Sequence, residues 1–539
     1  MPPPTAGLTR RPDYLRQVRR RYELLVLRFI ESTFRFQADV WWAEVKKPIR
    51  FPALFCGTFN HSPPTIVIRL AVAFVILGNA SAQIAPFSPD RPWHGIQEQQ
   101  IEDDSKHFPQ PRFRIEPDRT YSLAELIDLA EAHNPETRIA WEGARVQLAA
   151  LGIARSELYP TLAAIALSQT NRAEALFGDR FVRQSVQTSQ GVLELNYTIF
   201  DFGARAGRIE AAKAQLLAAN FAFNDTHRKL IYQVEQAYYT LLNASGQEQA
   251  ARADLTNAQT AQQAAEDQLK NGLATLPDVL EARSATAQAE YDLEAVLGSQ
   301  EIARGGLATA LGTSATVAIR AQPLDEIPTP DSIDDTVDQA IDRALEHRPD
   351  LMQQVAEIRS ANARIKEARA AYYPTMTVNA TPAAQSLNGV QQTFPWAHTR
   401  DLTGGLTLNL SWTVFDGGAR ENRVAQAEAN SRAAKAQVDA IRDQISNEIW
   451  TAYSNLKTTL RQRQSAISLL EAATQSYAAT LESYKSGVRN FLDVTSAQRT
   501  LSQARSADVL ARTQVLTAVA NLAFQAGDAI QSDTRKRRP

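Results

Sequence analysis

The sequence predicts a mostly α-helical protein with membrane β-strands, built from two similar halves. Three observations support this fold class. The motif Phe-Asp-x-Gly-Ala-Arg occurs at residues 200–205 and again at 415–420, 215 residues later. A strand-like stretch of alternating apolar and polar residues precedes each copy. A long segment almost free of glycine and proline follows each copy, so each half combines strands with a long helix.

The repeat also organises the rest of the chain. Gly272 matches Gly487 and Gly312 matches Gly527 at the same spacing, and the match continues from about residue 120 to residue 528. The predicted parts are an N-terminal extension and signal peptide (1–82), an N-terminal linker (83–119), the first repeat (120–328), the second repeat (329–528) and a basic C-terminal tail (529–539).

Residues 69–82 contain the parts of a secretory signal peptide in the usual order. Arg69 precedes the apolar run Leu70–Leu77, and the small residues Asn79–Ala82 end it in the pattern of a cleavage site. A buried helix is the alternative. Residues 1–68 are far longer than a normal basic flank, so they are either upstream of the true start or a real extension. Export indicates the periplasm of a Gram-negative cell or a location beyond it.

Composition excludes several classes of protein. The net charge of −2 gives no basic footprint for a nucleic acid. Cys56 is the only cysteine, which excludes disulfide frameworks and thiolate metal sites. After residue 83 no stretch approaches the ~18 apolar residues of a membrane-spanning helix.

Strands precede the repeated motif in each half. Residues 193–199 and 406–414 alternate strictly between apolar and polar side chains, and the segments behind Pro160 and Pro374 supply a second strand per half. Strands of ~9–11 residues can cross a membrane at a tilt with lipid on one side and water on the other. A soluble sandwich would show the same alternation. Tyr197 and Trp412 occupy equivalent apolar-face positions, as membrane-facing anchors or simply as good strand formers.

The long segments predict helices that no globular domain needs. Residues 204–271 and 419–486 would each extend ~100 Å at 1.5 Å per residue. Along the second, apolar residues from Val438 to Tyr484, including Ile449 and Ile467, recur with a mean period near 3.5, as in a coiled-coil seam. Shorter helices return at 276–311 and 491–525, and others precede the strands at about 122–157 and 335–371. Each half is therefore two strands plus a long helical hairpin.

Four strands cannot close a membrane barrel. Open strand edges leave backbone groups without partners in lipid, so other copies of the chain must complete the sheet. Single-chain barrels begin at about eight strands, which requires at least two chains and is better met by three. The polar segments 169–190 and 382–403 are expected to be external loops.

With these motifs, the sequence resembles the TolC-type outer-membrane efflux channels over residues 120–527. The resemblance rests on motifs that occur twice and in order: Asn134-Pro135 and Arg348-Pro349-Asp350, Tyr159-Pro160 and Tyr373-Pro374, the two Phe-Asp-x-Gly-Ala-Arg turns, and the hairpin tips Leu269–Gly272 and Tyr484–Gly487. It implies a homotrimer with a 12-stranded barrel in outer-membrane lipid and an α-helical cylinder in the periplasm. It also implies partners: a periplasmic membrane-fusion adaptor, and an inner-membrane RND or ABC pump that supplies energy.

The resemblance further implies a periplasmic gate at the hairpin tips. Tyr484, Arg489 and Asp493 match the gate positions, and Asp278 would be the acceptor on the other hairpin. The tip glycines Gly272 and Gly487 would lie where the adaptor makes contact.

Two features of the acids qualify this gate. Ser496 stands where related channels carry a second acid, so only one carboxylate ring, from Asp493, is expected, and cation selectivity should be weaker. Helix capping explains Asp278 and Asp493 equally well, because each lies three residues after a capping residue, Thr275 or Asn490.

No catalytic or cofactor-binding pattern is present in the sequence. The seven histidines have no metal-ligand spacing, and there is no phosphate-binding glycine loop or nucleophile elbow. Two function classes remain: a transport channel for efflux or type I secretion, and a non-conducting periplasmic coiled-coil scaffold or adaptor. The alternating strands favour the channel. The sequence does not identify the cargo.

Overall fold

The computed structural model describes residues 98–107, 115–116, 119–330, 332, 336–391 and 394–528. The chain divides into two compact units, residues 1–108 and 109–539. In the first unit the described element is helix α3 (Glu98–His107). The predicted signal peptide, most of the predicted linker and the basic tail lie outside the described residues.

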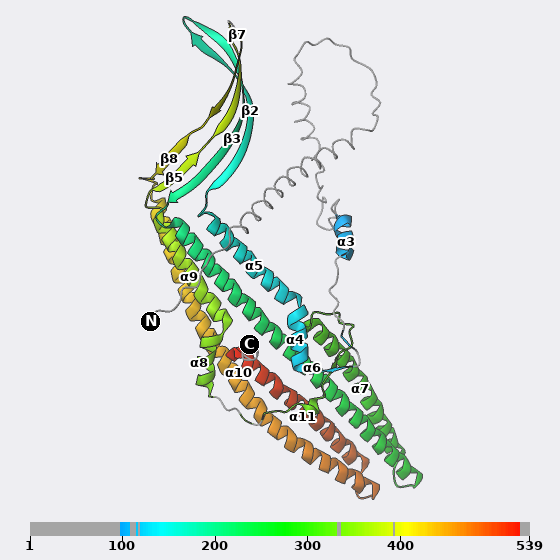
Figure 1. Cartoon of the computed structure of the whole chain (residues 1–539). Coiled ribbons are helices and arrows are strands. Elements are labelled where there is room, and N and C mark those ends of the chain that lie inside the picture. The colour runs from blue at the N-terminus through cyan, green and yellow to red at the C-terminus, as the bar shows by residue number, and fades with distance from the viewer. Residues whose placement is uncertain are drawn as a thin grey trace, which may run out of the picture. The chain divides into compact units, whose positions relative to one another are not determined.

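The second unit contains the two predicted halves, each with strands followed by a helical hairpin (Figure 1). The first half comprises β1 (Thr120–Tyr121), α4 (Leu123–His133), α5 (Pro135–Ser156), β2 (Thr161–Phe177), β3 (Arg180–Phe200), α6 (Ala204–Lys270) and α7 (Leu276–Ala310). The second comprises β4 (Arg320–Ala321), η1 (Leu324–Glu326), α8 (Val337–His347), α9 (Pro349–Ala370), β5 (Thr375–Ala380), β6 (Ala383–Gln391), β7 (Phe394–Thr403), β8 (Leu406–Ser411), α10 (Ala419–Lys485) and α11 (Phe491–Ala526). The predicted fold class is confirmed.

The repeated motif turns a strand into a long helix in both halves. Gly203 and Gly418 adopt φ of 95° and 87°, a left-handed conformation that favours glycine. In the first copy, Asp201 accepts hydrogen bonds from the backbone N–H groups of Gly203 and Arg205, and Arg205 also donates to the Ile199 carbonyl. The second copy repeats this with Asp416 and Arg420. The aspartate therefore caps the long helix and the arginine bonds the preceding strand, two roles that the sequence did not reveal.

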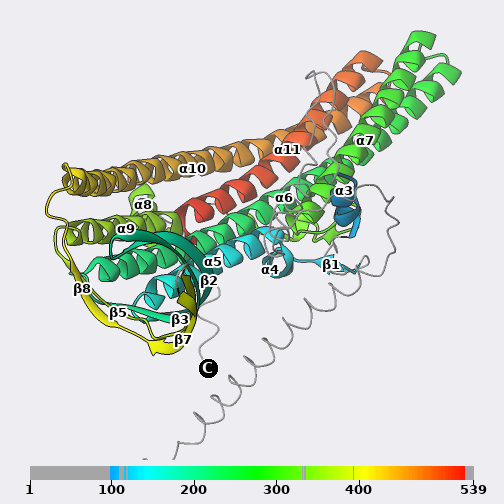
Figure 2. The same ribbon diagram turned by 90° about the horizontal axis from the view of Figure 1, so that it is seen from above.

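The sheet is four strands wide, with β2 at one edge and β7 and β8 at the other (Figure 2). Strand β3 pairs with β2 along its length and, on its other side, with β6 and then β5, all antiparallel. Strand β7 continues the sheet beyond β6, and β8 continues it beyond β5. Within the described residues neither edge has a further strand partner.

The external loops predicted at 169–190 and 382–403 are wrong, because both segments are strands. Strands β2 and β3 extend without interruption to a two-residue turn at Gly178 and Asp179. In the second half the extension is broken at Thr381-Pro382 and at Gly404-Gly405, where the proline lacks an N–H group. Polar composition was mistaken for loop structure, although a strand can carry polar residues on both of its faces.

The two predicted aromatic anchors occupy different environments. Tyr197 lies in β3 opposite Val378 of β5. Trp412 follows the last residue of β8, so the prediction that it is a strand residue is wrong. Its indole N–H donates to the Tyr372 carbonyl at 3.2 Å, and the residue remains 58% exposed. Contact of either aromatic with lipid remains a prediction.

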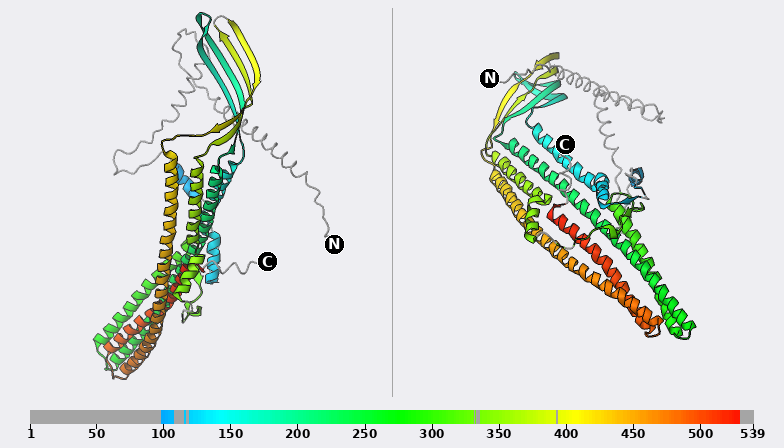
Figure 3. Two further views of the ribbon diagram at one scale, coloured as in Figure 1. Left: turned by 90° about the vertical axis from the view of Figure 1, so that its left-hand side faces the viewer. Right: turned by 60° about the horizontal axis from the view of Figure 1, so that its bottom comes forward.

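The two helical hairpins lie side by side (Figures 1 and 3). Helix α6 packs on α7 and α10 packs on α11, and α11 also packs on α6. Along α10, Val438, Ile445 and Ile449 are buried as the seam predicts. Ile467 is 42% exposed, however, while Ala466 is buried in its place. Apolar periodicity overlooked this alanine because small residues allow close helix packing without a large apolar side chain.

A buried ionic network joins α6, the start of α9, α10 and the end of α11. Arg228 is 1% exposed and bonds Asp225 at 2.7 Å and the Phe524 carbonyl at 3.0 Å. Arg348 is paired with Asp350 at 2.6 Å and with Glu448 at 2.7 Å. Burial opposes ionisation of Asp350, but its hydrogen bond to Arg348 and the charges of both arginines outweigh burial, so its pKa is below the ordinary value.

Candidate gate at the hairpin tips

Each hairpin reverses through a glycine in the left-handed region. Gly272 has φ 72° and Gly487 has φ 73°. The N–H of Gly272 donates to the Leu269 carbonyl at 2.9 Å, and the N–H of Leu273 donates to Gln268 at 2.8 Å. The second tip repeats these two bonds, which define a Schellman ending. The tips are therefore rigid turns of equal geometry at the same end of the second unit.

Tyr484 lies inside the apolar cluster between the two tips. Its ring is 6% exposed and meets Phe491 edge to face with centroids 5.5 Å apart. The cluster includes Val279 and Ala282 of the first hairpin, so Tyr484 links the hairpins by packing. Its hydroxyl is buried and has no hydrogen-bond partner among the described residues. Burial raises the pKa of Tyr484, and the negative charge of Asp278 raises it further.

The carboxylate of Asp278 caps its own helix. Its Oδ2 accepts from the Thr275 N–H at 2.9 Å and from the Thr275 hydroxyl at 2.7 Å, which forms a capping box at the start of α7. The sequence motif thus has the capping role that was weighed against gating. The structure places Asp278 close enough to Tyr484 to affect its ionisation but leaves no hydrogen bond between them.

Arg489 and Asp493 form a pair on the second tip. The guanidinium Nη1 lies 3.4 Å from Asp493 Oδ2, and the side chains are 61% and 36% exposed. Asn490 caps α11 by accepting from the Asp493 N–H at 2.9 Å. Arg489 precedes this cap, and because a positive charge at a helix N-terminus opposes the helix dipole, its carboxylate partner offsets that cost. Within the described residues the partner of Arg489 therefore lies on its own hairpin.

Contacts between the hairpins lie just above the tips, and sequence reasoning did not identify them. Gln268 donates to the Lys485 carbonyl at 2.7 Å, and the Tyr477 hydroxyl donates to the Asn257 carbonyl at 3.1 Å. Arg505 of α11 pairs with Asp254 of α6 at 2.6 Å. Apart from Lys485, which lies in the repeated tip motif, none of these residues belongs to a repeated motif, so the repeat did not indicate these contacts.

The tips also expose apolar side chains to solvent. They are Leu273, Leu276, Leu280, Val488 and Leu492, between 54% and 78% exposed. They surround Gly272 and Gly487, the two positions predicted to contact an adaptor. A cluster of exposed leucine and valine at the end of a long projection indicates a docking surface.

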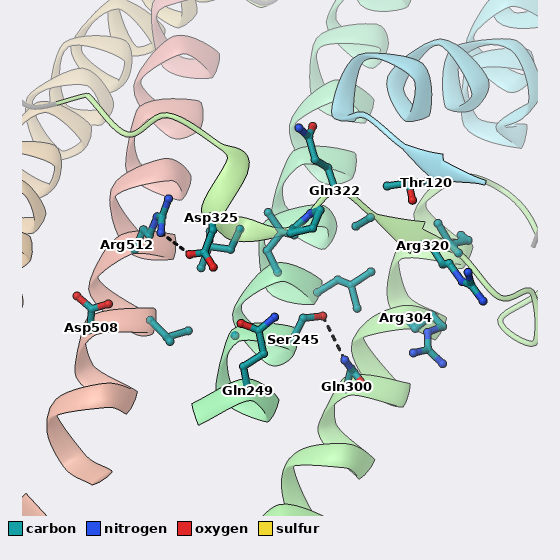
Figure 4. A pocket seen from close by; sticks show the side chains of 18 residues that line it. Thr120, Ser245, Gln249, Gln300, Arg304, Arg320, Gln322, Asp325, Asp508 and Arg512 are labelled. Carbon is teal, nitrogen blue, oxygen red and sulfur yellow. Dashed lines mark hydrogen bonds and ion pairs between the residues drawn. The ribbon is translucent and has the colours of Figure 1, made fainter. Parts of the chain in front are cut away.

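A separate cavity of about 320 Å³ lies where the connection between the halves crosses α6, α7 and α11 (Figure 4). Arg512 pairs with Asp325 at 2.8 Å, and the Gln300 amide donates to the Ser245 hydroxyl at 3.2 Å. The Arg512–Asp325 pair attaches the connection to α11, and the Gln300–Ser245 bond joins α7 to α6.

The described residues contain neither a cluster of three or more metal-ligating side chains nor a helix apolar enough to cross a membrane.

The chain is similar in sequence and in fold to known proteins. Residues 126–313 and 340–528 match the family described as outer membrane efflux protein. The protein CyaE of Bordetella pertussis is 28% identical over 76% of this chain and 84% of its own length. The alkaline protease secretion protein AprF of Pseudomonas aeruginosa is 27% identical over 63% and 70%. The outer-membrane channel OprN has the same fold, with a TM-score of 0.65 and 20% identity over 78% of this chain and 98% of that one.

Proposed function

This chain belongs to the outer membrane efflux protein family, and we propose that three copies of it form one channel, fed by a periplasmic adaptor and an inner-membrane pump. The protein is an outer-membrane channel for efflux or secretion, with its helices in the periplasm, and it is not an enzyme. The trimer, the partners and the gate are the parts that we propose.

The open sheet is the observation that supports the trimer. One edge is β2, and the other is formed by β7 and β8 in succession. Neither edge has a strand partner within the described chain, and unpaired backbone groups are costly in lipid. The two edge strands run in opposite directions, because each strand in the sheet is antiparallel to the next. The β8 edge of one copy can therefore pair with β2 of the next in an antiparallel ring. Because the sheet is four strands across at any level, three copies close a barrel that is 12 strands around.

Engineered disulfides would test the ring, because Cys56 is the only native cysteine and precedes the predicted cleavage site. We expect Ala164→Cys in β2, combined in turn with cysteine at positions along β8, to give a covalent trimer in at least one register. The measurement is the mass in denaturing gels with and without reductant. The matched control joins Ala164 to its register partner Leu193 in β3, a link within one chain that leaves the mass of a monomer. The proposal would be contradicted if no cysteine position along β8 gave a covalent trimer and the only linked species were dimers.

The tips support the proposed partners. The exposed apolar residues around Gly272 and Gly487 lie at the far end of the hairpins from the sheet, where an adaptor can reach them (Figure 1). AprF is named for secretion of a protease, whereas the family as a whole is described by efflux. Both cargo classes are therefore compatible with this chain, whose pump would select the cargo.

The gate prediction concerns Arg489 and Asp493. We expect either Arg489→Ala or Asp493→Ala to loosen the closed tip and raise single-channel conductance in planar bilayers, because each removes one member of the tip ion pair. Arg283→Ala is a matched control, since Arg283 pairs with Glu266 at 3.1 Å farther from the turn and is similarly exposed. Conductance unchanged in both variants would leave helix capping as the role of these residues.

A further inference from the structure

The strand register divides the sheet into two faces with different chemistry. One face, here called the outer face, carries Leu193, Leu195 and Tyr197 of β3 together with their register neighbours Leu162, Val378 and Leu408. The opposite face carries Glu194, Asn196 and Thr377. In a membrane barrel the apolar face meets lipid and the polar face lines the water-filled interior. The outer face is therefore the lipid-facing one.

The same register places three arginines on the outer face, away from the helical end. They are Arg172 of β2, Arg183 of β3 and Arg400 of β7, all exposed. His398 of β7 lies on the same face, as does one acid, Glu174, directly opposite Arg183. The outer face thus has a net positive belt, here called the basic belt, defined by Arg172, Arg183 and Arg400.

The height of the belt matches a membrane surface. Arg172 lies 10 residues along β2 from Leu162, and Arg183 lies 12 residues along β3 from Leu195, both outer-face leucines near the helical end. Arg400 of β7 is separated from Leu410 of β8 by the break at Gly404-Gly405. At ~3.3 Å per residue and a tilt of ~40°, the separations along β2 and β3 are about 25–30 Å along the membrane normal. An outward apolar band in such barrels is ~25 Å tall, so the belt lies at the headgroups of the outer leaflet.

A shallow hollow of about 550 Å³ lies beside Arg400 on this part of the sheet. The residues that line it are Ser189, Ala384, Gln385, Ser386, Arg400, Asp401 and Leu402. By register Ser189, Ser386, Arg400 and Leu402 belong to the outer face, whereas Gln385 and Asp401 belong to the opposite face. Hydroxyl and guanidinium donors lie above an apolar side chain, which is the order in which a lipid presents its headgroup and its acyl chains.

We propose that the basic belt and this hollow bind a phosphorylated lipid headgroup of the outer leaflet. A guanidinium binds phosphate through two parallel N–H donors, and basic side chains at a membrane surface are attracted to anionic lipid. The site fixes the height of the barrel in the membrane and seals its edge against the lipid. It rests on the proposed barrel and adds a lipid ligand to it.

Native mass spectrometry of the purified channel tests this site with diphosphorylated lipid A as the probe. We expect lipid adducts on the wild-type channel, and at least about tenfold weaker binding for Arg172→Gln combined with Arg400→Gln. The matched control, Arg180→Gln with Arg423→Gln, removes the same charge from the first residue of β3 and from α10, and should bind normally. Dephosphorylated lipid should bind weakly to all three proteins.

Two further measurements keep the test decisive. Arg172→Lys with Arg400→Lys retains the charge and should retain most of the binding, which tests the belt even if the glutamine variant fails to assemble. The conductance of each preparation distinguishes failure of the proposed channel from failure of the lipid site. A wild-type protein that does not conduct would contradict the proposed channel. A conducting glutamine variant that binds lipid A as tightly as wild type, or equal binding of dephosphorylated lipid, would overturn the lipid site.

Discussion

Replacing Arg228 by alanine is expected to lower the free energy of unfolding by about 3–5 kcal/mol, because it removes the buried partner of the Asp225 carboxylate and leaves only the exposed Lys229. Arg228 is 1% exposed and bonds Asp225, while its guanidinium also stacks over the Phe524 ring at 4.3 Å. The loss would be read as a lower melting midpoint, followed by far-ultraviolet circular dichroism of the helices in detergent.

The neighbouring residue provides the matched control for this prediction. Lys229 pairs with the same Asp225 at 2.8 Å, yet its side chain is 59% exposed. Water screens an exposed pair, so Lys229→Ala should cost less than about 1 kcal/mol. Replacing Asp225 and Arg228 together by Asn and Leu removes both charges and should recover part of the loss. Equal melting midpoints for the two single variants would show that burial of the ionic network does not determine its contribution.

Gly207→Ala is expected to destabilise the protein by about 1–3 kcal/mol through overpacking. Gly207 lies in α6 where α9 crosses it, and an added Cβ would come within 2.8 Å of the Glu367 backbone nitrogen and 3.0 Å of the Ala363 carbonyl oxygen. Backbone atoms of a packed helix cannot rotate away as a flexible side chain does, so the two helices would have to separate.

A second glycine provides a control for which the expected change in stability has the opposite sign. Gly152 lies within α5 with no atom within 4 Å of an added Cβ. Alanine there should stabilise the helix by about 0.5–1 kcal/mol, because glycine is the poorer helix former. The measurement is the same thermal midpoint for both variants. A loss for Gly152→Ala as large as that for Gly207→Ala would mean that helix propensity and not the close approach governs these sites.

The repeat made much of this fold predictable from sequence. Short sequence patterns predict features that depend only on neighbouring residues. These features are the hairpin ends, the turns at Gly203 and Gly418, and the strand alternation at 193–199. The tip residues Tyr484 and Arg489 were found through a resemblance that rests on these local motifs. Their gating role remains a prediction.

Contacts between distant segments were not predictable in this way. Asn134 and Arg348 occupy equivalent positions, and the sequence predicts the same helix start for both. In the structure Asn134 donates to the Ala310 carbonyl at 2.9 Å, whereas Arg348 joins an ionic network with Asp350 and Glu448. The sequence near each position does not indicate the bonds to Ala310 and Glu448, because these two partners lie on other helices.

By itself the sequence therefore determined the repeated architecture, the helix and strand boundaries near its motifs, and the apolar face of the sheet, all of which follow from short-range periodicity and turn chemistry. Only the tertiary structure decided which alanines form the helix seam, which charges are buried together, and that strands continue where loops were expected. Those outcomes depend on which segments pack against one another, and packing is set by side chains far apart along the chain.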